Sequence, residues 1–349
     1  MKRLSRSRII GTSLSLLAAW LVAAMLSMNV GSVGIPVLTA FRLLKDRILG
    51  GSSEGGPLAV ILFSVRLPRV FLGSLVGASL AVAGAAFQSL LRNPLADPYV
   101  LGVSTGASMG TIIHAIFTAS LGAAASGAFL YTRPLAAFLG AAVTVAAVYA
   151  IGGGTARAGE GSQRLLLAGI VLASFISSIN VFLLTSTNQA DLRGIFYWLI
   201  GDLSRPVDAS IYVVTVVVLA GSALLYLFSH SLNLISMGET NALILGVEVP
   251  RVKASVYLLA SLITGAVVSI SGPIAYIGLI CPHLARMLFG SDNRILFPTV
   301  FFFGAIFTLL ADTLARSLFS PTELPVGVIT ALCGAPLFIY LLHRKGGRE

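Results

Sequence analysis

The stretch that decides the fold runs from Arg66 to Gly110 and reads RLPRVFLGSLVGASLAVAGAAFQSLLRNPLADPYVLGVSTGASMG. Two apolar segments rich in Gly, Ala and Ser flank the short polar segment 92–98. A helix needs about 20 apolar residues to cross a bilayer. Small residues four apart let helices approach closely in lipid, where no hydrophobic force drives them together. This spacing predicts closely packed membrane helices, and it occurs at Gly73, Gly77, Ala81 and Ala85, and again at Gly102, Gly106 and Gly110.

The composition of the whole chain agrees with a membrane protein. Hydrophobic residues make up 56% of the 349 residues and charged residues 10%, and the mean hydropathy is +0.95. Soluble proteins carry about 25% charged residues. Apolar segments extend along nearly the whole chain, so we expect residues 1–349 to form one all-α polytopic membrane domain. Cytoplasmic loops collect Lys and Arg, so the net charge of +10 fits a membrane protein and does not indicate a nucleic-acid partner.

Breaks at Pro, Gly and charge clusters divide the chain into about ten spans. A shorter helix is expected at 191–200, outside the membrane. The two longest polar connections are an outer loop at about 31–57 and a cytoplasmic loop at about 231–253. The predicted spans are 9–30, 58–91, 99–120, 134–153, 163–186, 207–229, 252–271, 273–289, 296–317 and 325–342.

The basic residues set the predicted orientation. The N-terminus reads MKRLSRSR, which indicates that this end stays in the cytoplasm. An even number of spans returns the C-terminus to the same side, in a multi-pass protein of the cytoplasmic (inner) membrane. Fourteen Lys and Arg then lie inside and nine outside, which together make up all 23. The bias follows the positive-inside rule, and the outer basic residues need their own explanation.

Several chemistries have no sequence signature here. The P-loop motif needs a Lys after Gly, and none of the four lysines follows a Gly. No catalytic constellation, metal cluster or cofactor motif is present, so we expect a protein that is not an enzyme and holds no cofactor. His114 and Asp312 are the nearest approach to charges within spans, and interhelical hydrogen bonds explain them better than a proton relay. The scarcity of such charges counts against an ion-gradient-driven secondary transporter. Four scattered histidines count against a membrane-embedded enzyme.

Six motifs occur in order along the chain: RLPR at 66–69, NPLADP at 93–98, LGVSTGA at 101–107, GPIAYIGLICPHLAR at 272–286, DNR at 292–294 and ELPVGVITALCGAPLFIYLL at 323–342. Through these motifs the chain, from about residue 58 onward, resembles the permease subunits of ABC importers for iron-siderophores, haem and cobalamin (type II importers). The resemblance implies the permease fold of that class, with ten spans per subunit and a homodimer whose pathway lies at the dimer axis. It also implies two separate ATPase subunits and a periplasmic or lipoprotein substrate-binding protein.

Three outer arginines have two interpretations. Arg66, Arg69 and Arg316 are either solvated side chains near the lipid headgroups or contacts for a partner. For Arg69 there is a further interpretation, in which it stabilises the turn locally. The resemblance assigns them to docking, because matching positions in the family meet acidic residues on the binding protein. Arginine suits that contact because its planar fork pairs bidentately with carboxylates.

The polar break after the second span also has two interpretations. Asn93, Pro94 and Leu95 form either a simple turn, since Pro interrupts a helix, or the cytoplasmic gate that the resemblance implies. The glycine-rich loop from Gly152 to Gly161 is either a linker or a second gate. We expect the translocation cavity to be lined by small and apolar residues, including Ala78, Val82 and Ala85.

The cytoplasmic loop 231–253 contains a predicted helix at 239–246, which ends at Gly246, a residue typical of helix C-termini. It is either a surface helix or, by the resemblance, the coupling helix that contacts the ATPase. The residues at that contact are then Glu239, Asn241, Leu245 and Gly246. The favoured cargo is an iron-siderophore, with cobalamin or haem next, and the alternative function is ion-gradient-driven secondary transport.

Overall fold

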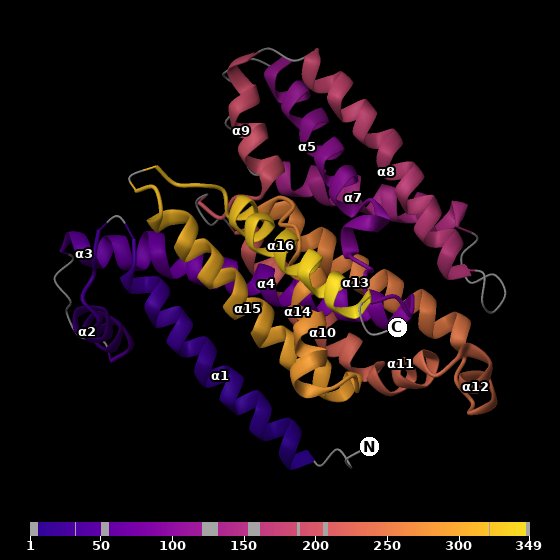
Figure 1. Cartoon of the computed structure of the whole chain (residues 1–349). Helices are drawn as coiled ribbons and strands as arrows, with labels where there is room; N and C mark the ends of the chain where they lie inside the picture. The colour runs from indigo at the N-terminus through magenta and orange to yellow at the C-terminus, as the bar shows by residue number, and fades with distance from the viewer. Residues whose placement is uncertain are drawn as a thin grey trace.

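The computed structural model describes residues 6–31, 33–49, 56–120, 132–152, 161–186, 189–204, 209–320 and 322–346. Within these ranges the chain is all-helical (Figure 1). The helices are α1 (Arg6–Asn29), α2 (Val37–Ile48), α3 (Pro57–Val60), the π-helical turn η1 (Ile61–Arg66), α4 (Leu67–Leu90), the 3-10 turn η2 (Pro98–Leu101), α5 (Val103–Ser120), α7 (Arg133–Ile151), α8 (Gly161–Thr185), α9 (Gln189–Ile200), α10 (Ser210–Leu227), α11 (Ser229–Ser236), α12 (Glu239–Ile244), α13 (Val249–Ser271), α14 (Ile277–Phe289), α15 (Asn293–Ser317) and α16 (Val326–Gly346).

Each predicted span contains one long helix. Within the described ranges, seven helical segments are long and apolar enough to cross a membrane, and two shorter apolar helices lie at Ile277–Phe289 and Val326–Tyr340. The remaining predicted span is the 18-residue helix α5. The span predicted at 58–91 is a continuous helical segment, Pro57–Leu90, which includes the turn η1. The short helix expected at 191–200 is α9.

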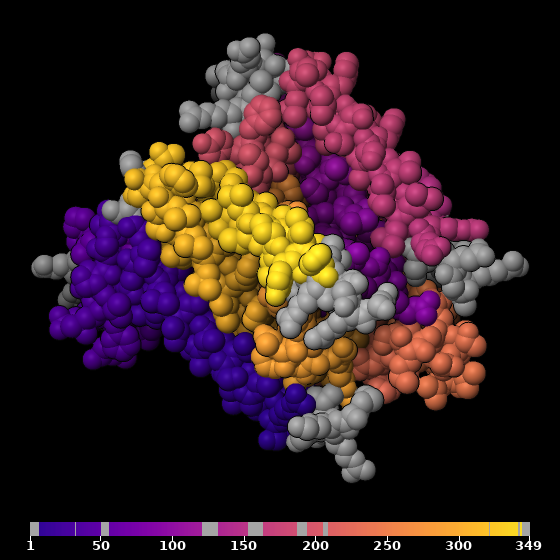
Figure 2. Space-filling view, in the orientation of Figure 1, coloured from indigo at the N-terminus to yellow at the C-terminus, as the bar shows by residue number. Residues whose placement is uncertain are grey.

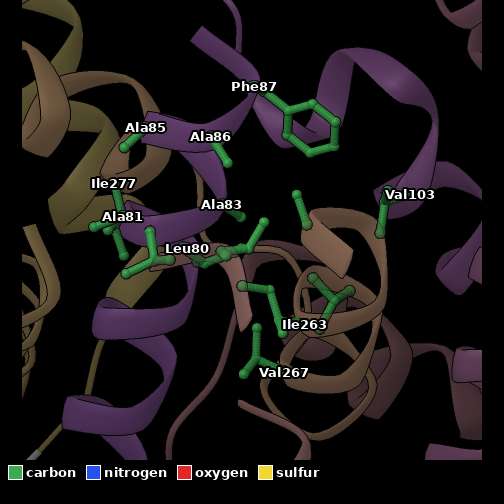
Figure 3. Close-up of a cluster of buried hydrophobic side chains, with 14 of the residues drawn as sticks. Leu80, Ala81, Ala83, Ala85, Ala86, Phe87, Val103, Ile263, Val267 and Ile277 are labelled. Atoms are coloured by element: carbon green, nitrogen blue, oxygen red, sulfur yellow. The ribbon is translucent and has the colours of Figure 1, made fainter. Parts of the chain in front are cut away.

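Helix α4 forms the centre of the bundle. Of its apolar stretch, 94% is buried within the chain, against 11% for α1, which lies at the edge of the molecule (Figure 1). Side chains of α4 pack against Ile263, Val267 and Ile277 of α13 and α14 (Figure 3). A helix that is apolar on every side is suited to this position, because neighbouring helices cover all of its faces.

Glycines in α4 allow its neighbours to approach to backbone contact. A Cβ atom on Gly84 would lie 1.9 Å from the carbonyl oxygen of Gly278 in α14. A Cβ on Gly77 would lie 2.2 Å from the carbonyl oxygen of Gly304 in α15. The small residues predicted at Gly102, Gly106 and Gly110 allow α5 and α7 to approach in the same way. A Cβ on Gly110 would lie 2.1 Å from the carbonyl oxygen of Ala136. The close packing predicted from the small residues is confirmed.

The packing corrects the prediction for the pathway. Ala78, Val82 and Ala85 are at most 1% exposed, and they lie in the core of the single chain. A cavity at a dimer axis must be lined by residues that one subunit leaves uncovered, so these three do not line it in this structure. The small residues that suggested a pathway instead allow the surrounding helices to close around α4.

The two ends of the bundle contain different elements. The α2 end contains α2, the last turn of α1 and the start of α4 (Figure 1). The α12 end contains α11, α12 and the start of α1 (Figure 1). The polar break after α4 lies at the same end, because Arg92 contacts Glu239 of α12. The glycine-rich loop predicted as a linker or second gate lies outside the described residues from position 153 to 160.

Changing Gly84 to Ala tests the contact between α4 and α14. The added methyl group would overlap a backbone carbonyl that cannot rotate away, so the helices must separate, and we expect the free energy of unfolding to fall by about 3 kcal/mol. Gly11→Ala is the matched control, because a Cβ there meets nothing within 4 Å. Thermal unfolding in detergent measures both variants, and equal midpoints for the two would contradict the packing described here.

Candidate functional site: charged clusters at the two ends of the bundle

A buried cluster of charges lies at the α2 end. The guanidinium of Arg69 donates from Nε and Nη2 to Asp312, with the shortest contact at 2.9 Å, and from Nη1 to Glu323 Oε2 at 2.6 Å. Arg316 Nε lies 3.3 Å from the second oxygen of Asp312. Asp312 therefore joins α15 to α4, which confirms the interhelical hydrogen bond expected of it. We call Arg66, Arg69, Asp312, Arg316 and Glu323 the arginine cluster.

The other two arginines bind the end of α1. Arg316 Nη2 donates to the backbone oxygen of Ser27 at 2.6 Å, and Arg66 Nη1 donates to that of Met28 at 2.5 Å. Arg66 also donates to the carbonyl of Val33. The last carbonyls of a helix lack intrahelical partners and carry partial negative charge, so cations stabilise them. These contacts attach α1 to α4 and α15.

The arginines are not the exposed side chains that the sequence predicted. Arg66, Arg69 and Arg316 are 4%, 8% and 6% exposed, because each donates to carboxylates or carbonyls of the same chain. Glu323 is the accessible member of the cluster, with 43% of its side chain exposed. Sequence reasoning missed Glu323 as their partner, since 254 positions separate it from Arg69 and no local pattern connects them.

The polar break after α4 is an ordered turn at the α12 end. Arg92 has φ of +50°, and Asn93 Oδ1 accepts a hydrogen bond from the amide of Leu95 at 2.9 Å. Leu95 is 46% exposed. Asp97 then accepts from the amide of Tyr99 at 2.8 Å and caps the turn η2. Burial raises the pKa of the Asp97 carboxyl to about 6. A gate at Asn93, Pro94 and Leu95 remains a prediction.

Glu239 connects three parts of the α12 end. Its carboxylate lies 2.5 Å from Lys253 Nζ on α13 and 3.7 Å from Arg92 Nη2 in the break after α4. The Glu239 side chain is only 5% exposed. The sequence placed Glu239 on a contact surface, but the structure uses its charge to hold α12 against the bundle.

Large apolar side chains are exposed on α12 and beside its two ends. The large exposed side chains there are Met237 at 71%, Leu243 at 47%, Ile244 at 78% and Leu245 at 63%, and we call these four the α12 face. Ala242 points the other way and is fully buried. Exposed apolar patches of this kind mark interaction sites. Figure 2 shows α11 and α12 at the molecular surface.

Three of the four predicted coupling residues lie at this surface. Asn241, Leu245 and Gly246 are exposed. Gly246 has φ of +84°, and a Cβ atom added there would meet nothing within 4 Å. The structural helix ends at Ile244, two residues before the predicted end. Sequence reasoning missed Met237, Leu243 and Ile244, although their apolar character within a polar loop was a usable signal.

Side-chain hydrogen bonds fix α11 to the start of α15. Asn233 Nδ2 donates to Asp292 Oδ1 at 2.8 Å, and Asn233 Oδ1 accepts from the amide of Asn293 at 2.9 Å. Partial burial raises the pKa of Asp292, but hydrogen bonds from Arg294 and Asn233 outweigh it and hold that pKa below its ordinary value. The carboxylate therefore stays ionised at neutral pH and caps α15.

Comparison with known proteins identifies the family. The model of the FecCD transport family matches residues 18–344. This chain belongs to that family. It is 40% identical to the cobalamin import system permease of Halobacterium salinarum over 82% of this chain and 74% of that protein. It is 35% identical to the hemin transport system permease of Yersinia pestis over 95% of this chain and 96% of that protein.

A solved structure shows the same fold. The inward-facing structure of a metal-chelate type ABC transporter matches with a TM-score of 0.81 at 30% identity, over 95% of this chain and 98% of that one. The FecCD chain described here is therefore a multi-pass permease of the type II ABC importers. Permeases of this class are not enzymes, and they work with ATPase and binding-protein partners.

Asp312→Asn tests the arginine cluster. Removing this negative charge leaves the buried guanidinium groups of Arg69 and Arg316 without their shared carboxylate. We therefore expect the free energy of unfolding to fall by about 3–5 kcal/mol. Arg251→Gln is the control, because its ion pair with Glu248 is exposed and should contribute about 0–1 kcal/mol. Thermal unfolding in detergent compares them, and equal losses would show that the buried cluster has no special importance.

Proposed function

We propose that two copies of this FecCD permease form the membrane channel of an importer for a metal chelate. An iron-siderophore is the favoured cargo, followed by cobalamin or haem. Two ATPase subunits bind in the cytoplasm, a substrate-binding protein docks on the outer side, and the cargo crosses at the dimer axis by alternating access. The observation that carries the proposal is the exposed α12 face at one end, with the arginine cluster at the other.

The α12 face is the proposed contact for the ATPase. Leu243 and Ile244 lie on α12 itself, and Met237 and Leu245 lie just before and just after it. The ion pair of Glu239 with Lys253 holds α12 against α13. Because Glu239 pairs with both Lys253 and Arg92, a displacement of α12 acts on α13 and on the turn 91–98 together. Movement of the ATPase subunits would reach the proposed gate at Asn93, Pro94 and Leu95 by this route.

The orientation follows from the same assignment. If α12 meets the ATPase, the start of α1 and the end of α16 lie in the cytoplasm. Basic side chains at the α12 end support this, since cytoplasmic loops favour Lys and Arg. They include Arg92, Arg251, Lys253 and Arg294. The arginine cluster then lies on the outer side, where the binding protein delivers its cargo.

Leu245→Glu tests the coupling surface. A carboxylate in an apolar contact stays desolvated without a partner, so we expect binding of the ATPase subunit to weaken by about a hundredfold or more. Leu49→Glu is the matched control, because Leu49 is 70% exposed at the opposite end, and this variant should bind the ATPase as the wild type does. Co-purification from membranes measures both. Unchanged binding by Leu245→Glu would remove α12 from the contact.

Uptake into proteoliposomes tests the function itself. The permease would be reconstituted with the ATPase and binding protein encoded beside it, and offered radiolabelled cobalamin, haem and a ferric siderophore in parallel. We expect one cargo to accumulate, and only when ATP and all three proteins are present. Accumulation driven by a proton or sodium gradient without ATP would favour a secondary transporter instead.

A further inference from the structure

The two acidic partners of Arg69 differ in accessibility. Asp312 accepts hydrogen bonds from Nε and Nη2 of the guanidinium, and its side chain is 2% exposed. Glu323 accepts from Nη1, and its side chain is 43% exposed. Asp312 is therefore a fixed part of the protein interior. The bond from Nη1 to Glu323 is the part of the arrangement that borders the surface.

The backbone around Glu323 is held in place independently of its side chain. The amide of Leu324 donates to the carbonyl of Ala315 at 3.1 Å, and the amide of Thr322 donates to that of Phe319 at 2.9 Å. Pro325 restricts the residue before it to extended conformations. The carboxylate of Glu323 can therefore leave Arg69 by rotation about its own side-chain bonds, while the segment stays where it is.

The remaining arginines are committed to the chain itself. Arg66 and Arg316 donate to carbonyls at the end of α1, which a partner cannot replace without releasing that helix. The arginine cluster contains three cations and two anions, a net charge of +1, and without Glu323 this becomes +2. Arg69 Nη1 is thus the donor in the cluster that an external carboxylate can take at the least structural cost.

We propose that Glu323 occupies the position of a carboxylate from the docking partner, and that this partner's Asp or Glu displaces it from Arg69 Nη1. The proposal rests on the proposed function, in which the binding protein docks at the α2 end. The exchange replaces one ion pair by another and returns Glu323 to water. The free energy of docking is therefore less favourable than it would be at an unpaired arginine. Glu323 thereby lowers the affinity for the binding protein and favours its release after delivery.

Glu323→Gln tests this competition. Glutamine keeps the size of the side chain but removes the charge that competes for Arg69, so we expect the binding protein to dock about tenfold more tightly. The permease–ATPase complex in lipid nanodiscs would be titrated with the fluorescently labelled binding protein encoded beside it, at low and high salt. Tightening should be greater at low salt, because charge complementarity is screened by ions.

Two further variants separate specific competition from other effects. Asp46→Asn removes one negative charge from the exposed surface of α2 at the same end, and it should leave the affinity within about twofold of the wild type. Glu323→Asp keeps the charge but shortens the reach to Arg69 by one methylene, so it should tighten docking less than Glu323→Gln. The thermal midpoint of each variant verifies that it is folded.

Each outcome has a distinct meaning. Docking to the wild type with no gain, or with a loss, in the folded Glu323→Gln variant overturns the competition and leaves the proposed function intact. An equal gain from Asp46→Asn also overturns it, because a general charge effect would then explain the result. If the wild type itself fails to dock, the proposed function fails together with the inference.

Discussion

The close approach of glycine backbones around α4 is the constraint on which the rest of this permease depends. Lipid is as apolar as the side chains that face it, so packing in the membrane must come from van der Waals contact and hydrogen bonds at short range. Gly77 and Gly84 allow this close contact with α15 and α14, respectively. Once α4 is enclosed in this way, the positions of the helices that carry both charged clusters follow.

The arginine cluster shows how charge is tolerated inside such a bundle. Removing a guanidinium from water is costly unless carboxylates or helix-end carbonyls compensate it. Asp312 compensates Arg69 and Arg316, and the last carbonyls of α1 accept from Arg316 and Arg66. The cluster therefore attaches the peripheral helix α1 to the core, and an arginine that serves this purpose is only partly available to a partner.

At the opposite end, charge and apolar surface have separate roles. Glu239 is buried and holds α12 on the bundle, while the apolar side chains of the α12 face point outward. A contact surface needs rigid support to transmit movement. The ion pairs of Glu239 attach α12 to α13 and to the break after α4, and the hydrogen bonds of Asn233 attach α11 to the start of α15. The proposed coupling contact would rest on this support.

The sequence by itself determined the helical segments, the stripes of small residues, the ordered break after α4 and the family. These depend on local composition and on motifs, which are visible along the chain. Only the tertiary structure decided that Ala78, Val82 and Ala85 lie in the core, that Arg66, Arg69 and Arg316 turn inward, and that Glu239 is an anchor. The physical reason is that lipid-facing and core-facing sides of a membrane helix are both apolar. The pattern of hydrophobic residues therefore cannot show which side its neighbours cover, or which distant carboxylate a buried arginine meets.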